Sequence, residues 1–151
     1  MRVLLTGAGG QLGKCIIDRA PDTWNLTALT SAAFDITAQG QAKQVFEKHQ
    51  PDIVINAAAY TAVDKAENNV ELARSVNAIA IKNLAAQCRE NGILLIHMST
   101  DYVFDGESAV PYAEDDPINP INIYGKTKAE GEQAIGRSGC DYLIIRTSWV
   151  F

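Results

Sequence analysis

The chain has 151 residues, of which 47% are hydrophobic and 21% charged, and this ordinary globular composition excludes intrinsic disorder for most of its length. Its 13 basic and 18 acidic residues give a formal net charge of −5, which argues against a nucleic-acid partner because such binding needs clustered positive charge. No apolar run approaches the ~20 residues that span a bilayer, so no membrane partner is expected.

Three cysteines lie far apart in the sequence, at Cys15, Cys88 and Cys140. Their spacing excludes a CxxC redox or zinc motif, and a sparse, odd set of thiols is typical of a reducing compartment. Glycines begin too early in the chain for a secretory signal, and we therefore expect a cytoplasmic protein. The acidic run at 114–116 is typical of a solvated loop, so no metal site is predicted.

Short apolar runs alternate with amphipathic stretches along the whole chain. Strands are predicted, in chain order, at 2–6, 25–29, 52–56, 93–99 and 142–147. Helices are predicted between them, at 11–19, 38–49, 70–91 and 124–135. The strands are continuous apolar runs, as in parallel sheets that are covered on both faces. The sequence therefore predicts an α/β fold over 1–151, with a Rossmann-like, doubly wound parallel sheet and helices on both faces.

Two segments depart from this alternation. Residues 105–123 contain Pro111, Pro117 and Pro120 and follow no period, so we expect a long irregular loop, which in a compact domain is usually functional or disordered. The chain also stops on an apolar stretch directly after its last predicted strand. From this ending we expect that a further region follows residue 151.

A glycine-rich loop joins the first predicted strand to the first predicted helix. Residues 6–13 read TGAGGQLG, which places glycines at Gly7, Gly10 and Gly13. Glycines at this spacing let the backbone turn sharply and approach a pyrophosphate, while the helix N-terminus offers unpaired N–H groups to the anion. Because the loop stands between a strand and a helix, it predicts dinucleotide binding.

The end of the second predicted strand leaves the type of dinucleotide open. NAD-binding domains usually carry an Asp or Glu there for the adenosine ribose, whereas this chain has Thr30 and Ser31. Asp35 follows slightly later and either lies beside the adenine or its ribose, or stands at the start of a helix. The expected cofactor is therefore NADP(H) or NAD(H).

Tyr124 and Lys128 are spaced i, i+4 on a predicted helix and therefore share one face, whereas Lys126 points elsewhere. A tyrosine can move a proton when its pKa falls from about 10 toward neutrality. A lysine charge about 5 Å away is worth ~3 kcal/mol at an effective dielectric constant of ~20, or roughly two pKa units. We therefore expect Lys128 to lower the pKa of Tyr124.

Hydroxyl side chains follow the fourth predicted strand, at Ser99 and Thr100. Ligands of open parallel sheets bind at the carboxyl ends of the strands, so a hydroxyl there can donate to a substrate carbonyl. The alternative is that both hydroxyls satisfy backbone groups at the strand end. His97, the polar residue inside this apolar strand, is expected to be a core residue.

Four further segments, together with the glycine loop, resemble the extended short-chain dehydrogenase/reductases. They are NAAAYTAVDKAE at 56–67, STDYVFDG at 99–106, PINIYGKTK at 120–128 and RTSWVF at 146–151. The resemblance covers the chain from end to end and is closest to the members that reduce a 4-keto nucleotide sugar in dTDP-L-rhamnose biosynthesis, a route to polysaccharide precursors.

That resemblance implies an oxidoreductase that transfers a hydride from the nicotinamide to C4 of dTDP-4-dehydro-L-rhamnose. Tyr124 would protonate the developing alkoxide, and Lys128 would hold the nicotinamide ribose. Thr100 would donate a hydrogen bond to the substrate carbonyl.

The resemblance also implies further contacts and a second part of the protein. Residues at the ends of the first three strands would contact the cofactor: Gly10, Gln11, Leu12, Asp35, Ile36, Ala59, Tyr60 and Thr61. Asp101 and Trp149 would contact the sugar. Members of the family carry a smaller C-terminal lobe that binds much of the nucleotide sugar, and this lobe is missing from the 151 residues. The resemblance leaves open whether the protein is a homodimer.

Two other functions compete with a ketoreductase. One is a non-catalytic NAD(P)-binding regulatory subunit, which the presence of Thr100, Tyr124 and Lys128 disfavours. The other is an epimerase or dehydratase for a related nucleotide sugar. Dehydratases of this superfamily typically add acidic catalytic residues beside the strand-four threonine, where this chain has Asp101 and Tyr102, and this difference favours the simple reductase.

Overall fold

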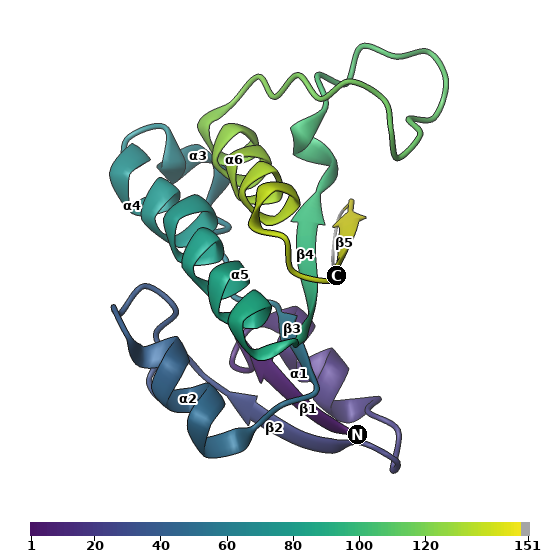
Figure 1. The fold of residues 1–151 in the computed structure, drawn as a ribbon. Coiled ribbons are helices and arrows are strands. Elements are labelled where there is room, and N and C mark those ends of the chain that lie inside the picture. The colour runs from purple at the N-terminus through teal and green to yellow at the C-terminus, as the bar shows by residue number, and fades with distance from the viewer. Residues whose placement is uncertain (149–151) are drawn as a thin grey trace.

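The computed structural model describes residues 1–148. Five parallel strands form one sheet in the order β2-β1-β3-β4-β5 (Figure 1). Their bounds are β1 (Arg2–Thr6), β2 (Asn25–Leu29), β3 (Ile53–Asn56), β4 (Leu94–Thr100) and β5 (Tyr142–Thr147). Since all strands run the same way, their carboxyl ends meet at one edge of the sheet. The predicted parallel α/β fold is confirmed.

Helices connect the strands. Their bounds are α1 (Gln11–Asp18), α2 (Gln41–His49), α3 (Val63–Ala66), α4 (Val70–Arg74), η1 (Ser75–Ile79), α5 (Ala80–Asn91), η2 (Asp101–Val103) and α6 (Ile123–Ser138). Figure 1 shows α2, α5 and α6 in front of the sheet and α1 behind it. Both faces of the sheet therefore carry helices, as the sequence predicts.

Two clusters of apolar side chains lie on opposite faces of the sheet, because successive residues of a strand point to opposite sides. Leu4, Val54 and Leu95 are paired neighbours in β1, β3 and β4 and pack with residues of α2, α5 and α6. Val3 and Leu5 point the other way and pack with Ile16 of α1. Each strand is therefore apolar on both sides, which explains why the sequence shows continuous runs.

The ends of several elements differ from the prediction. α2 begins three residues late because Gly40 is left-handed, with a φ of 77°. The helix predicted at 70–91 consists of α4, a π-helical turn (η1) and α5, and it ends as predicted at Gly92, whose φ is 63°. α3 and η2 were not predicted, because segments of four and three residues are too short to show a period.

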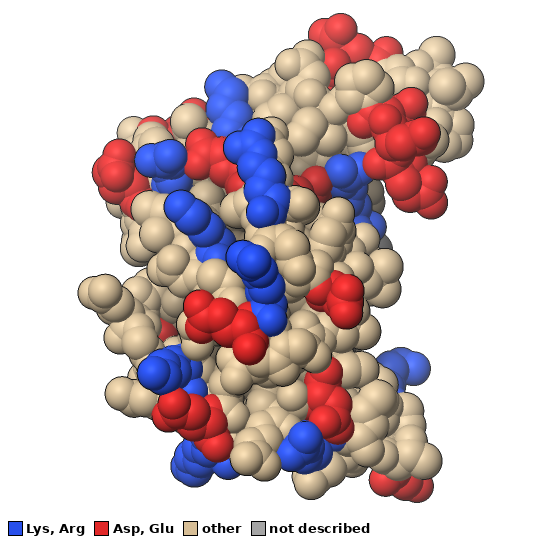
Figure 2. Space-filling model, in the orientation of Figure 1, with Lys and Arg blue, Asp and Glu red and all other residues tan. Residues whose placement is uncertain are grey.

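The loop after η2 contains no helix or strand between residues 104 and 122, as the sequence predicts. It projects from the upper part of the molecule in Figure 1. Acidic side chains gather in that part of the surface in Figure 2. The acidic residues of the loop are Asp105, Glu107 and the run at 114–116. On the helical face of the same view, basic and acidic side chains are interspersed.

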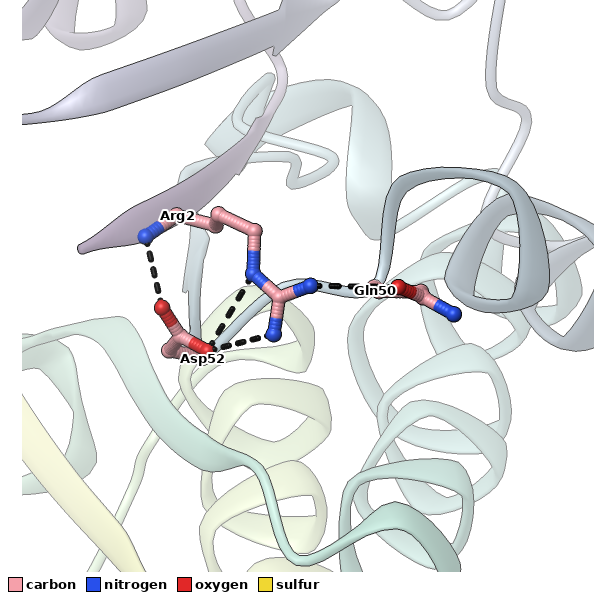
Figure 3. A network of polar contacts seen from close by, with 3 residues as sticks. All are labelled: Arg2, Gln50 and Asp52. Atoms are coloured by element: carbon pink, nitrogen blue, oxygen red, sulfur yellow. Dashed lines mark hydrogen bonds and ion pairs between the residues drawn. The ribbon is translucent and has the colours of Figure 1, made fainter.

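A polar network ties β1 to β3 at the end of the sheet opposite the carboxyl ends (Figure 3). The backbone N–H of Arg2 donates to Asp52 Oδ2 at 2.7 Å, and its guanidinium donates to Asp52 Oδ1 at 2.7 Å and to Gln50 Oε1 at 3.2 Å. The same contacts lower the pKa of Asp52. The network fixes where the two strands begin, and it lies apart from the cleft described below.

Candidate active site

A cleft of about 410 Å³ opens at the carboxyl edge of the sheet. It is lined by the carboxyl ends of β4 and β5, by residues that follow β1, β3 and β4, and by the first turns of α3 and α6: Gly10, Gln11, Leu12, Ala57, Ala59, Thr61, Val63, Met98, Ser99, Thr100, Asp101, Tyr102, Tyr124, Lys128 and Thr147. The parallel topology therefore brings the glycine loop, the strand-four hydroxyls and the Tyr–Lys pair to one place.

Most of the residues singled out from the sequence line this cleft. The exceptions are Gly7, Gly13, Asp35, Ile36 and Tyr60, which are not among its lining residues. Trp149 lies outside the described residues.

Gly7 and Gly13 are needed beneath the loop rather than in the cleft. Gly7 has a φ of 70°, and a Cβ there would lie 2.5 Å from the backbone nitrogen of Ala58. A Cβ at Gly13 would lie 2.3 Å from the carbonyl oxygen of Gly7. Only glycine allows the loop, α1 and the segment after β3 to pack this closely.

The start of α1 is suited to an anion. The N-cap residue is Gly10, which provides no side-chain cap, and the first turn contains no acidic residue. Its first N–H groups are therefore left for a ligand, and no nearby carboxylate of that turn opposes a negative charge. Gln11 and Leu12, the first two residues of α1, line the cleft.

Asp35 and Ile36 occupy other positions. The carboxylate of Asp35 accepts hydrogen bonds from the backbone N–H and the hydroxyl of Thr37, at 2.9 and 2.7 Å, and these contacts lower its pKa. This is a local turn, and the following helix begins only at Gln41. The alternative that Asp35 starts a helix is therefore wrong. Ile36 is buried in the main apolar cluster.

Tyr60 is held by a π-helical turn that the sequence did not reveal. Asn77 of η1 accepts the backbone N–H of Tyr60 at 2.9 Å and donates to its carbonyl oxygen at 3.0 Å. It also donates to the hydroxyl of Thr127 in α6 at 3.2 Å. Asn77 thereby fixes the segment after β3 against the helix that carries Tyr124 and Lys128. Single π-helical turns inside helices are frequent at functional sites.

Tyr124 and Lys128 both lie at the buried side of α6. The N-cap residue of α6 is Asn122, whose side chain accepts the backbone N–H of Gly125 at 2.7 Å. Gly125 permits close packing, because a Cβ there would lie 2.2 Å from the carbonyl oxygen of Tyr102. The predicted shared face is confirmed, and Lys126 is exposed.

Lys128 is almost completely buried, with 1% of its surface exposed. Its Nζ donates to the carbonyl oxygen of Met98 at 2.6 Å and lies 3.4 Å from His97 Nε2. Burial lowers the pKa of Lys128 to about 8, while the charge of Glu132 acts in the opposite direction.

The pKa of Tyr124 differs from the prediction. Burial raises it above its usual value, hydrogen bonding with Thr100 lowers it, and Asp101 and Tyr102 raise it further. The expectation that Lys128 lowers the pKa of Tyr124 is therefore wrong for this structure. The physical reason is that burial opposes ionisation of the phenol more strongly than the hydrogen bond with Thr100 favours it.

Both interpretations of the strand-four hydroxyls are represented. Ser99 donates to the Glu132 carboxylate at 2.5 Å, so its hydroxyl serves the interior. Thr100 lines the cleft, accepts the backbone N–H of Tyr102 at 3.2 Å and donates to Asp101 Oδ1 at 3.0 Å. Thr100 therefore caps η2 while its side chain faces the cleft.

Glu132 is a buried residue of this region that sequence reasoning missed. It is 6% exposed and accepts hydrogen bonds from Arg146 at 2.8 and 3.1 Å. Its position four residues after Lys128 was the available signal, but charged residues at this spacing usually lie on a solvated helix face. The ion pair between Glu132 and Arg146 joins α6 to β5.

A second, larger hollow of about 950 Å³ adjoins the cleft and shares Asp101 and Tyr102 with it. It lies over the loop after η2 and over β5, whose Leu143 and Ile145 are exposed. Within residues 1–148, no three His, Cys, Asp or Glu side chains converge as metal ligands. No helix of the described part has the length and apolar character needed to cross a membrane.

The parallel sheet, with helices on both faces and a glycine loop at its carboxyl edge, defines a Rossmann-like α/β domain, as the sequence predicts. Residues 1–151 match the family model described as "RmlD substrate binding domain". The chain belongs to this family.

Named relatives agree with this assignment. The chain is 42% identical over 151 residues to dTDP-4-dehydrorhamnose reductase of Burkholderia thailandensis, covering 100% of this chain and 51% of that protein. It is equally identical, at 42%, to the spore coat polysaccharide biosynthesis protein SpsK of Bacillus subtilis, covering 99% and 53%. The chain thus spans about half the length of these curated relatives.

A solved structure shows the same fold. The crystal structure of dTDP-4-dehydrorhamnose reductase from Bacillus anthracis in complex with NADP superposes with a TM-score of 0.97 at 40% identity. The match covers 99% of this chain and 54% of that one. The predicted resemblance to this group of reductases is confirmed.

Replacing Gly13 with alanine tests the packing under the loop. The added Cβ would lie 2.3 Å from the Gly7 carbonyl oxygen, and such overpacking typically costs about 1–3 kcal/mol. We expect Gly13→Ala to weaken binding of NADP⁺ at least about tenfold in calorimetric titration.

Gly9→Ala is the matched control for this change. Its Cβ would lie 3.6 Å from Thr30 Cγ2, an ordinary contact, so NADP⁺ affinity should stay close to that of the unmodified chain. Equal affinities for both variants would contradict the account of the loop.

Proposed function

We propose that this chain is the dinucleotide-binding domain of a reductase for the 4-keto group of dTDP-4-dehydro-L-rhamnose, with NADP(H) or NAD(H) as cofactor. The observation that carries the proposal is the cleft, in which the start of α1 faces Thr100, Tyr124 and Lys128. The relatives named dTDP-4-dehydrorhamnose reductase support the choice of substrate.

The residues of the cleft fit a dinucleotide. Gly10, Gln11 and Leu12 would receive the pyrophosphate, because the N–H groups at the start of α1 have no side-chain cap. Ala59, Tyr60 and Thr61 would follow the cofactor past the end of β3, and Asp35 and Ile36 would mark the adenine side. The bound dinucleotide would supply the hydride that reduces the ketone.

Tyr124 is the proton donor in this proposal. Because burial raises its pKa, the phenol keeps its proton at neutral pH and can give it to the oxygen that becomes the product hydroxyl. Thr100 would turn its single O–H from Asp101 to the same oxygen and stabilise the charge that develops there. Lys128 would hold the ribose next to the nicotinamide.

The sugar would occupy the side of the cleft at Asp101, next to the larger hollow over β5. We propose that a second lobe of the protein covers the nucleotide sugar there, since the relatives are about twice as long as this chain. Trp149 is proposed as a further sugar contact. The three free thiols of Cys15, Cys88 and Cys140 support a cytoplasmic location, and a homodimer is compatible with the proposal.

Tyr124→Phe tests the role of the phenol. The variant keeps the ring that packs in the cleft and removes the proton, so kcat should fall by ~10²–10⁴-fold while NADPH affinity stays nearly unchanged. The measurement is NADPH oxidation at 340 nm with dTDP-4-dehydro-L-rhamnose, and it uses the full-length protein.

Tyr142→Phe serves as the control, because Tyr142 is an exposed residue of β5 and should support unchanged turnover. Turnover of Tyr124→Phe at the unmodified rate would refute the proton-donor role. An unmodified protein that binds NADPH but reduces no nucleotide sugar would favour the regulatory subunit.

Thr30→Asp tests the choice of dinucleotide. Thr30 lies against the glycine loop, 3.6 Å from the position of a Cβ on Gly9, and a carboxylate there would repel a 2′-phosphate but can accept from a ribose hydroxyl. We expect NADPH affinity to fall at least about tenfold while NADH affinity is kept. Thr30→Asn is the control, because asparagine has the shape of aspartate without its charge, and it should change neither the NADPH nor the NADH affinity. An equal loss of affinity for both cofactors in Thr30→Asp would contradict the placement of Thr30 beside the adenosine ribose.

A further inference from the structure

Three buried polar side chains form a line behind the cleft. Asn56 at the end of β3 and His97 in β4 are paired neighbours in the sheet, and both are 0% exposed. Asn56 Nδ2 lies 3.0 Å from His97 Nδ1, and His97 Nε2 lies 3.4 Å from Lys128 Nζ. The mechanism proposed above uses Lys128 and leaves Asn56 and His97 without a role.

The orientation of the Asn56 amide is fixed by its other partners. Its Oδ1 accepts the hydroxyl of Thr6 at 2.5 Å, and its Nδ2 donates to the carbonyl oxygen of Ala58 at 3.3 Å. A carbonyl oxygen can only accept, so the NH₂ group must face Ala58. The same NH₂ group then donates its second hydrogen to His97 Nδ1.

The amide decides the tautomer of His97. Burial and the charge of Lys128 lower the pKa of His97 well below its usual value, so the ring is neutral. A neutral imidazole has one N–H group. Since Nδ1 accepts from Asn56, the proton must lie on Nε2, and this N–H faces Lys128 Nζ.

An N–H group directed at a lysine nitrogen discriminates between its two protonation states. A neutral amine has a lone pair that can accept from the imidazole, whereas an ammonium group has only donors. At the same time the Met98 carbonyl accepts a hydrogen from Nζ in either state. The contact with Met98 is therefore available to both forms of Lys128, and the contact with His97 favours the amine form.

We propose that Asn56 and His97 are positioning residues that act through Lys128: Asn56 fixes the proton of His97 on Nε2, and this N–H stabilises the amine form of Lys128. A lysine that releases its proton readily can return the phenol of Tyr124 to its protonated form after each proton donation. The ammonium gives one proton to the phenolate, and the amine left behind takes a replacement proton from water that enters the cleft. This use in catalysis rests on the proposed function, whereas the tautomer and the state of Lys128 do not.

Other groups around Lys128 act on the same balance. Glu132 on α6 favours the ammonium form, and Arg146 of β5 partly neutralises that carboxylate. Asp101 and Tyr102 of η2 line the cleft with Lys128, as does Tyr124 of its own helix. His97 is the titratable neighbour that β4 contributes, and in this proposal its N–H opposes the effect of Glu132.

The first test uses the unmodified chain without any dinucleotide. Long-range ¹⁵N–¹H NMR spectra distinguish the two histidine tautomers, and they should show His97 as the neutral Nε2–H form at pH 7. An Nδ1–H tautomer or an imidazolium ion would overturn the proposal. Because no variant is involved, this result does not depend on the folding of an altered protein.

The second test converts Asn56 from a donor into an acceptor. In Asn56→Asp the carboxylate accepts from Nδ1–H, so the proton of His97 moves to Nδ1 and Nε2 becomes an acceptor for the ammonium group. The pKa of Lys128, followed by NMR of labelled lysine, should rise from about 8 by at least about one pH unit. A folded Asn56→Asp protein with an unchanged tautomer or an unchanged Lys128 pKa contradicts the proposal.

Asn77→Asp is the control, because it places a carboxylate at a buried asparagine that binds Tyr60 and Thr127 instead of His97. It should leave the His97 tautomer as in the unmodified chain. In the reductase assay, the alkaline limb of the kcat profile should move upward with the Lys128 pKa in Asn56→Asp while NADPH affinity stays similar. A chain that shows the Nε2–H tautomer but no reductase activity would refute the proposed function alone.

Discussion

Close packing of α6 against its neighbours is the constraint on which the site depends. At Gly125 and Gly131 a Cβ would lie 2.2 Å from the carbonyl oxygens of Tyr102 and Asn77, respectively. Glycine at both positions lets the helix lie directly on η2 and η1, and this depth buries Lys128 beside β4. The ordinary surface chemistry of a lysine is thereby replaced by that of a desolvated amine.

Parallel pairing supplies the other half of the arrangement. The segments that follow β1, β3 and β4 come from distant parts of the sequence, yet they meet at one edge. The uncapped start of α1 and the side chain of Tyr124 then face the same cleft. The proposed cofactor site and the proposed reaction site share one edge because the strands share one direction.

The sequence was sufficient for features with a local cause. Continuous apolar runs predicted the five strands, the glycines at 7, 10 and 13 predicted the loop, and the i, i+4 spacing placed Tyr124 and Lys128 on one face. It was insufficient where distant segments decide. The contact of Asn56 with His97 depends on the register of β3 and β4, and the burial that raises the pKa of Tyr124 comes from residues far away in the chain.

The most direct measurement of the central claim is a crystal structure of this chain grown with NADP⁺. The account predicts density for the pyrophosphate at the start of α1, with the nicotinamide riboside against Tyr124 and Lys128. A dinucleotide bound elsewhere, or one whose nicotinamide points away from the Tyr124 phenol, would contradict it.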